Sequence, residues 1–335
     1  MFNVAVVGAT GAVGATMLRV LEERGFPVTE LRPLASERSE GLRLDYLGQE
    51  RTVRRLSADS FEGIHIALFS AGSTRALEFA PAAVEAGAVV IDNSSAYRMD
   101  DAVPLVVPEV NEADLEGHAG IVANPNCVAA PLVVALKPLA DAVGLERVII
   151  SSYQSVSGTG QAAVRELREQ TAGLLAGAEP EPVVYPHPIA FNVLPHIDSF
   201  DESGYTGEER KVAAETRKML GMPDLRVSAT CVRVPVIQSH SQAVHIETTD
   251  PISAQAARNL LMAAPGVILV DEPGLNLYPL PREATGRDDV FVGRIREDSS
   301  YSRGLALWVV SDNLRKGAAT NAVQIAESLV TKGWL

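Results

Sequence analysis

The chain has 335 residues, and 29 Lys and Arg against 42 Asp and Glu give a net charge of −13 at pH 7. A hydrophobic content of 47% is ordinary for globular proteins and excludes disordered and fibrous classes. The acidic balance argues against nucleic-acid binding, which needs a basic face, and no apolar run approaches the roughly 18 residues of a membrane span. Two cysteines cannot form a disulfide framework. With no signal-peptide pattern after Met1, we expect a cytoplasmic enzyme of two domains, without a membrane or nucleic-acid partner.

The first part of the chain alternates short apolar runs with helical patterns. Its first run, Asn3 to Val7, is apolar almost throughout, as in a strand buried on both faces. Further strands are expected at 31–35, 64–69, 89–91 and 120–123, with helices at 13–23 and 76–86. Strands that alternate with helices through short turns predict a parallel sheet with helices on both faces.

The character changes after Asn124, where the expected strands become longer and alternate between apolar and polar residues. Helices are expected at 128–139, 161–175 and 253–264, and strands at 147–153, 226–235, 242–248, 290–296 and 304–310. This half therefore predicts a mixed or antiparallel sheet. A last helix at 318–330 carries an apolar stripe that needs a surface to cover.

A glycine-rich turn, Gly8-Ala9-Thr10-Gly11-Ala12-Val13-Gly14, connects the first strand to the first helix. Glycines let the backbone approach a pyrophosphate, and the helix N-terminus supplies amide donors. We therefore predict a dinucleotide site that includes Gly8, Thr10, Gly11, Ala12, Val13 and Gly14. The alternative is a tight turn that needs small residues only for packing.

The end of the second strand bears on the choice between NAD and NADP. NAD sites usually place an acidic residue there to bind the ribose hydroxyls. This chain offers Ser36, Arg38 and Ser39, which could hold a 2′-phosphate, with Glu37 between them. The segment favours NADP over NAD, and a polar surface loop is the alternative.

Cys127 closes a strand and opens a helix in Asn124-Pro125-Asn126-Cys127. The positive end of the helix dipole favours the thiolate there, and a thiolate beside a nicotinamide suggests aldehyde oxidation through a thioester. Cys231 lies inside an expected strand, and we interpret it as a buried apolar residue.

Histidines offer a base for this thiol but no metal site. His240 follows a strand, and His245 lies five residues further on. In a continuous strand an odd spacing places the two on opposite faces, so they are not expected to share a metal. Position alone leaves His240 undecided between a base and a structural residue.

Several charged residues could bind anions. Arg98 follows a strand in Asp92-Asn93-Ser94-Ser95-Ala96-Tyr97-Arg98, and Arg233 lies on the strand that leads to His240. Glu208 and Lys211 are three residues apart, so a helix would place them on one face. Each alone could equally be a solvated surface charge.

Together these segments resemble bacterial aspartate-semialdehyde dehydrogenase, over residues 3–327. The most specific match is Val227 to Val234 with Ser239-His240-Ser241, and residues 92–100, 103–111, 153–158 and 312–319 also match. The resemblance implies NADPH-dependent reduction of L-aspartyl 4-phosphate to L-aspartate 4-semialdehyde and phosphate, in lysine, threonine, methionine and diaminopimelate biosynthesis.

The resemblance also implies a role for each matching residue. Cys127 would form the thioester, His240 would act as acid or base, and Gln154 would orient the acyl group. Phosphate would be held by Arg98, Lys211 and Asn93, the substrate carboxylate by Arg233, and the α-amino group by Glu208. Ser157 and Gly158 would lie near the nicotinamide, and Asn313 would contact the cofactor.

The implied fold is a Rossmann-type domain at 1–126, completed by the C-terminal helix 314–335, and an α+β catalytic and dimerisation domain with a mixed sheet at 127–313. A homodimer would form through the second domain's sheet. Two alternatives stay open: N-acetyl-glutamyl-phosphate reductase, which shares the thiol chemistry, and a non-catalytic dinucleotide-binding paralogue. The second is kept open because Val128, Ala129 and Ala130 replace hydroxyl residues usual after the family's cysteine.

Overall fold

The computed structural model describes residues 1–335 as two compact units. The N-terminal unit contains Met1–Asn126 and Ala318–Leu335, and the C-terminal unit contains Cys127–Gly317. Residues 314–317, expected to fall with the N-terminal domain, lie in the C-terminal unit. None of the helices combines the length and apolar character that crossing a membrane requires.

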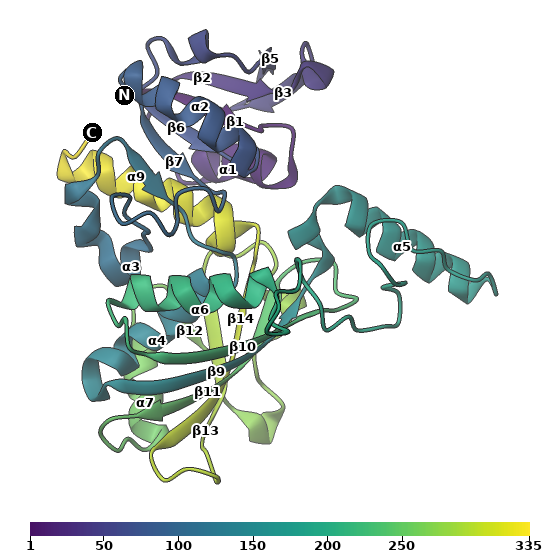
Figure 1. The fold of residues 1–335 in the computed structure, drawn as a ribbon, viewed down its shortest axis with the longest axis vertical. Helices are drawn as coiled ribbons and strands as arrows, with labels where there is room; N and C mark the ends of the chain where they lie inside the picture. Colours follow the sequence, from purple (N-terminus) through teal and green to yellow (C-terminus); the bar gives the residue numbers. More distant parts are fainter. The chain divides into compact units, whose positions relative to one another are not determined.

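The N-terminal unit is built on a six-stranded sheet in which every pair is parallel, as the alternating pattern predicted. Its strand order is β5-β2-β1-β6-β7-β8, and Figure 1 labels all of these strands except β8. The strands are β1 (Phe2–Val7), β2 (Val28–Ala35), β5 (Arg54–Arg55), β6 (Ile66–Phe69), β7 (Val89–Asp92) and β8 (Ile121–Ala123). Strand β1 is central, and its last four residues are buried, so its apolar run reflects contact with helices on both faces.

Helices cover both faces of this sheet. Helices α1 (Ala12–Glu23) and α9 (Thr320–Lys332) share one core with it, and α2 (Ser73–Glu85) packs in the other. Ala322, Ile325 and Leu329 of α9 are fully buried. The apolar stripe expected on the last helix therefore packs in the core of the N-terminal unit. A short helix, α3 (Pro108–Asn111), and a polar hairpin of β3 (Arg43–Tyr46) and β4 (Gln49–Thr52) complete the unit.

The C-terminal unit carries the predicted mixed sheet, in the order β10-β9-β11-β14-β13-β12. Strands β9 and β10 are parallel, whereas β11 runs antiparallel to both β9 and β14. The strands are β9 (Leu145–Gln154), β10 (Arg226–Arg233), β11 (His240–Thr248), β12 (Val267–Leu269), β13 (Val290–Glu297) and β14 (Gly304–Ser311).

Three helices cover one face of the mixed sheet: α4 (Ala129–Val143), α6 (Gly207–Leu220) and α7 (Ala254–Ala263). Helix α6 begins with a capping box in which Thr206 accepts from the Glu209 N–H. Helix α7 begins at the predicted cap, where the Ser253 hydroxyl accepts from the Ala256 N–H. Helix α5 (Gln161–Leu175) projects away from the sheet within this unit (Figure 1), and α8 (Pro281–Ala284) is a single turn.

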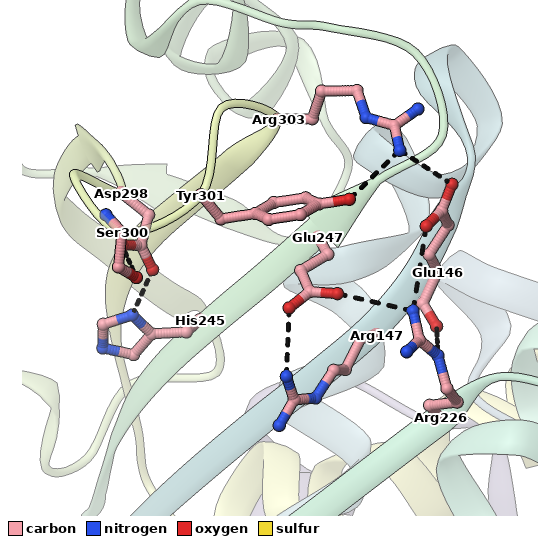
Figure 2. Close-up of polar contacts among 9 residues, drawn as sticks. All are labelled: Glu146, Arg147, Arg226, His245, Glu247, Asp298, Ser300, Tyr301 and Arg303. Carbon is pink, nitrogen blue, oxygen red and sulfur yellow. Dashed lines mark hydrogen bonds and ion pairs between the residues drawn. The ribbon is translucent and has the colours of Figure 1, made fainter.

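The other face of the mixed sheet is only partly covered: Ala284 of α8 packs on Phe291 and Val310, and the part formed by β9 and β11 is open. Tyr153 there is 38% exposed and its ring contacts that of Trp308, with centroids 5.5 Å apart. His245 also lies on this face, bonded to Asp298 at 3.0 Å, and therefore opposite His240, as the odd spacing predicted. Figure 2 shows ion pairs at one edge of this face, among Glu146, Arg147, Arg226, Glu247 and Arg303.

Candidate active site

Three predicted site residues share one level and one face of the mixed sheet. Gln154 and Arg233 are partners across the β9–β10 ladder. Ser241 of β11 pairs with Tyr153 of β9, so His240 lies beside Gln154. Because neighbouring residues of a strand point to opposite faces, these side chains fall on the helix-covered face, where all three are at most 5% exposed.

Cys127 joins this group from the start of α4. Its Sγ lies 3.4 Å from Nε2 of His240, within reach of a hydrogen bond involving sulfur. Gly317 makes room for the thiol-bearing residue: a Cβ on Gly317 would lie 3.0 Å from the Cβ of Cys127. The structure thus brings together a partly exposed thiol and an imidazole from distant parts of the chain.

His240 is held neutral by its surroundings. It is 1% exposed, and burial holds its pKa well below the ordinary 6.5, with the charge of Arg233 lowering it further. The main-chain N–H of Ser155 donates to Nδ1 at 3.0 Å. Since Nδ1 accepts, the single proton of the neutral ring belongs on Nε2, which faces the sulfur of Cys127.

A buried polar network supports this imidazole. The Ser155 hydroxyl lies 3.1 Å from Nδ1 of His240 and donates to Oδ1 of Asn313 at 3.1 Å. The Ser239 N–H donates to the same oxygen at 2.9 Å, and Nδ2 of Asn313 donates to the Ser157 hydroxyl at 3.0 Å. Ser155 was not among the predicted site residues, although it lies between Gln154 and Ser157 in the matching segment 153–158.

Arg233 is a buried guanidinium with unused donors. It is 5% exposed, its Nη1 donates to the Ser155 carbonyl at 2.8 Å, and its buried Nε has no partner. No Asp or Glu forms an ion pair with it. Burying a charge without a partner is costly, so these free donors indicate a binding position for an anion.

Glu208 and Lys211 both lie on α6 but in different surroundings. Glu208 is 7% exposed and accepts from Nε2 of Gln154 at 3.3 Å. Lys211 is about one-third exposed and pairs with Asp198 at 2.5 Å. This bond is the main reason that the pKa of Asp198 lies below its ordinary value. Both residues lie on α6, as the helical spacing predicted, but the structure pairs Lys211 with a loop carboxylate.

Arg98 and Asn93 lie in the N-terminal unit, after β7. Arg98 is 7% exposed, with Nε donating to the Asn124 carbonyl at 2.9 Å and Nη2 to the Asn93 carbonyl at 2.8 Å. Oδ1 of Asn93 accepts from Nδ2 of Asn124 at 2.6 Å. Both side chains are therefore fixed by the segment that precedes Cys127.

The glycine-rich turn opens onto a cavity of about 680 Å³ in the N-terminal unit. Gly8 and Gly14 are required by the turn itself: a Cβ on Gly8 would lie 2.4 Å from the Ser70 carbonyl oxygen, and one on Gly14 would lie 2.2 Å from that of Gly8. Gly11 precedes α1 as its N-cap and lines the cavity. Ala12 and Val13 form the first residues of α1 and its amide donors. The cradle thus fits a bound dinucleotide.

The end of β2 forms another wall of this cavity, with Ser36, Glu37 and Arg38 in its lining. Ser39 adjoins them, and its hydroxyl lies 3.4 Å from that of Thr10. Glu37 pairs with Arg55 at 3.5 Å, which draws the intervening acidic group toward a cation. Arg55 and Arg75 also line the cavity. The sequence did not point to them, because neither lies in the segment after the expected strand 31–35, where the residues that distinguish NAD from NADP are expected.

Cys231 is the buried residue that its strand position predicted. It is fully buried, and burial raises the pKa of its thiol to about 12. Its main-chain N–H donates to Oε1 of Glu209 at 3.0 Å. The two thiols of the chain therefore differ sharply in chemical setting.

Family models and relatives match this chain over nearly its whole length. A family model described as "Semialdehyde dehydrogenase, NAD binding domain" matches residues 3–118, and "Semialdehyde dehydrogenase, dimerisation domain" matches residues 136–316. The chain is 56% identical to aspartate-semialdehyde dehydrogenase of Aquifex aeolicus (strain VF5), covering 99% of each. It is 54% identical to that of Bacillus subtilis (strain 168), covering 98% of this chain and 97% of the relative.

Solved structures give the same result. Aspartate semialdehyde dehydrogenase II of Vibrio cholerae complexed with ASA matches with a TM-score of 0.95 and 51% identity, over 99% of this chain and 98% of that one. Aspartate semialdehyde dehydrogenase with NADP from Candida albicans matches with a TM-score of 0.79 and 26% identity, over 100% of both chains.

Proposed function

The chain belongs to the aspartate-semialdehyde dehydrogenases, and we propose that it reduces L-aspartyl 4-phosphate to L-aspartate 4-semialdehyde and phosphate with NADPH. The reaction is reversible and feeds lysine, threonine, methionine and diaminopimelate biosynthesis. The observation that carries the proposal is the 3.4 Å contact between Cys127 and His240, beside a buried Arg233 with unused donors.

Cys127 is the nucleophile in this proposal. As a thiolate, its sulfur attacks the acyl carbon, a C–S bond forms, and the carbon–oxygen bond to phosphate breaks, which leaves a thioester and inorganic phosphate. The proton on Nε2 of His240 faces the sulfur, so the imidazole stabilises the thiolate and can donate to the oxygen that gains negative charge. When bound, the reduced nicotinamide would supply the hydride to the acyl carbon, and the C–S bond would break to give the aldehyde and the Cys127 thiolate.

The substrate's charged ends are assigned to two residues. Arg233 grips the α-carboxylate, because a guanidinium with free donors can form two parallel hydrogen bonds to it. Glu208 accepts from the α-amino group, and its bond to Gln154 places that amide where it can orient the acyl group.

Phosphate is assigned to Arg98, Asn93 and Lys211. Lys211 is free to turn from Asp198 to a phosphate, since an exposed lysine pair contributes only modestly to stability. Arg98 is held by carbonyls of Asn93 and Asn124, which fixes its guanidinium in place before an anion binds.

The cofactor is assigned to the turn Gly8, Thr10, Gly11, Ala12, Val13 and Gly14 for the pyrophosphate, and to Ser36, Arg38 and Ser39 for a 2′-phosphate. The cavity lining supports NADP over NAD: Arg38, Arg55 and Arg75 place positive charge near the end of β2, where a 2′-phosphate would lie, and Glu37 faces Arg55 at 3.5 Å. Ser157, Gly158 and Asn313 are assigned to the nicotinamide end.

One assay tests this function against both alternatives. Purified protein is supplied with NADP, phosphate and aspartate semialdehyde, or with N-acetyl-glutamate semialdehyde in its place, and NADPH formation is followed at 340 nm. Turnover of the first aldehyde alone supports the proposal, and turnover of the second would indicate N-acetyl-glutamyl-phosphate reductase. No turnover of either, with intact NADP binding, would indicate a non-catalytic paralogue. Cys127→Ala and Cys231→Ala serve as the matched pair of variants.

We further infer that the protein is a homodimer joined through the open face of the mixed sheet. The Tyr153–Trp308 ring pair, with Tyr153 38% exposed, gives this face the aromatic character of an interface. Ala243→Glu should convert the dimer to a monomer in light scattering after size exclusion, because it places a charge at the centre of the face. Ala256→Glu, on the exposed side of α7, should not; a dimer in both variants would place the interface elsewhere.

A further inference from the structure

The loop that follows α5 brings an aromatic ring to Arg233. The centroid of the Tyr185 ring lies 5.9 Å from Cζ of Arg233, within the range of a cation–π contact. Only one hydrogen bond, to the Ser155 carbonyl, otherwise holds this guanidinium. The side chain that would grip the substrate carboxylate is thus oriented by one carbonyl and one ring.

The ring itself is fixed from its hydroxyl end. The Tyr185 hydroxyl donates to Oγ1 of Thr159 at 2.9 Å, and Thr159 ends η4 (Val156–Thr159), which contains Ser157 and Gly158. A Cβ on Gly158 would lie 3.1 Å from Nη1 of Arg233, so the guanidinium also packs closely against this turn. Tyr185 therefore connects the loop to both Arg233 and the turn beside it.

Two buried side chains of α5 hold the loop on either side of Tyr185. The Glu166 carboxylate accepts from the main-chain N–H groups of Val183 and Val184, at 3.1 and 2.6 Å. The Gln170 carbonyl accepts from those of Ile189 and Ala190, at 2.9 and 3.2 Å. Glu166 and Gln170 are 5% and 7% exposed. Four main-chain bonds to one helix place the ring before any substrate arrives.

We propose that Tyr185 is a positioning residue that holds Arg233 for the α-carboxylate of the substrate and so contributes to substrate specificity. The proposal rests on the proposed function, in which Arg233 binds that carboxylate. An arginine side chain has many rotamers, and a ring beside its guanidinium restricts them at no cost to its hydrogen-bond donors. The ring also contributes a cation–π attraction that a partly buried site strengthens.

Three variants separate the ring from the hydroxyl and from general packing. Tyr185→Leu removes the ring, and Tyr185→Phe keeps the ring but loses the bond to Thr159. Tyr301→Leu is the matched control, because Tyr301 lies under Arg303 at the same 5.9 Å at the edge shown in Figure 2, among residues with no assigned part in the reaction. Tyr185→Met fills the space without a ring should the leucine variant fail to fold.

Each protein is assayed with NADP and phosphate on aspartate semialdehyde and on 3-aminopropanal, the same aldehyde without its carboxylate. Tyr185→Leu should raise KM for aspartate semialdehyde roughly five- to thirtyfold, with kcat changed less than about twofold. Its kcat/KM for 3-aminopropanal should equal that of the wild type, because that substrate does not use Arg233. Tyr185→Phe, which keeps the ring but loses its bond to Thr159, should fall between wild type and Tyr185→Leu on aspartate semialdehyde, and Tyr301→Leu should stay within about twofold of wild type on both.

The two ways of failing are distinct. Equal losses on both aldehydes in Tyr185→Leu, or a Tyr185→Leu variant with the wild-type KM for aspartate semialdehyde, would overturn the positioning role while leaving the proposed function intact. A wild-type enzyme that does not distinguish the two aldehydes would instead contradict the assignment of Arg233 to the carboxylate, and with it the premise.

Discussion

The two cysteines should react with alkylating agents at very different rates. A thiol of ordinary pKa, about 8.5, is roughly one-tenth thiolate at pH 7.5. With its pKa raised to about 12 by burial, Cys231 is thiolate in roughly 3 molecules per 100,000, about 3,000-fold fewer. Its full burial slows access further. Iodoacetamide should therefore label Cys127, which is partly exposed and beside His240, long before Cys231.

Peptide mapping after partial labelling at pH 7.5 measures this directly, with activity followed on the same samples. Inactivation should track the label on Cys127, and a substrate analogue should slow both. Cys127→Ala should abolish turnover but keep NADP binding, whereas Cys231→Ala should cost about 1 kcal/mol of stability and keep most activity. Labelling mainly at Cys231, or an active Cys127→Ala enzyme, would refute the thioester mechanism.

Three further predictions concern the cofactor, phosphate and pH. Arg38→Ala should weaken NADP binding roughly tenfold or more and leave NAD nearly unchanged, measured by titration against Arg43→Ala; equal losses for both cofactors would contradict the 2′-phosphate site. Lys211→Met should raise KM for phosphate about tenfold, and likewise a neutral residue at Arg98, whereas Lys137→Met should not; unchanged phosphate dependence would remove these residues from the site. Because the pKa of His240 is lower in the folded state than unfolded, its proton favours unfolding as pH falls below about 6.5. Binding of this proton in the unfolded state should lower the free energy of unfolding by up to about 1.4 kcal/mol at pH 5.5. Denaturant titrations of His240→Gln should not show that loss.

The sequence was most informative where secondary structure is set by local pattern. The apolar run of β1 and the glycine turn that follows it predicted a buried parallel strand and a helix entry. The β3–β4 hairpin was missed because it is short and mostly polar: in β3 only Leu44 and Tyr46 alternate with polar residues and face the core, and β4 has no apolar residue. Two apolar positions in a four-residue strand are too few to form a recognisable alternation.

The ion pair of Lys211 could not be predicted from the sequence either, but for a different reason. Helical spacing correctly placed Glu208 and Lys211 on one helix, but the partner of Lys211 is Asp198, in an irregular loop with a φ of +71°. A left-handed aspartate outside any helix or strand has no periodicity that relates it to a helix. Such a contact depends on how the loop folds over α6, which spacing along the chain does not encode.

His240 shows most clearly where prediction from the sequence ends. The odd spacing to His245 was enough to place the two on opposite faces of one strand, but not to decide what His240 does. That depends on the strand order β10-β9-β11, which brings His240 beside Gln154, and on the Ser155 N–H, which fixes the proton on Nε2. Every residue except proline has such an N–H, so no residue type marks it. The group that directs the imidazole toward Cys127 is main chain, and only the fold reveals which amide it is.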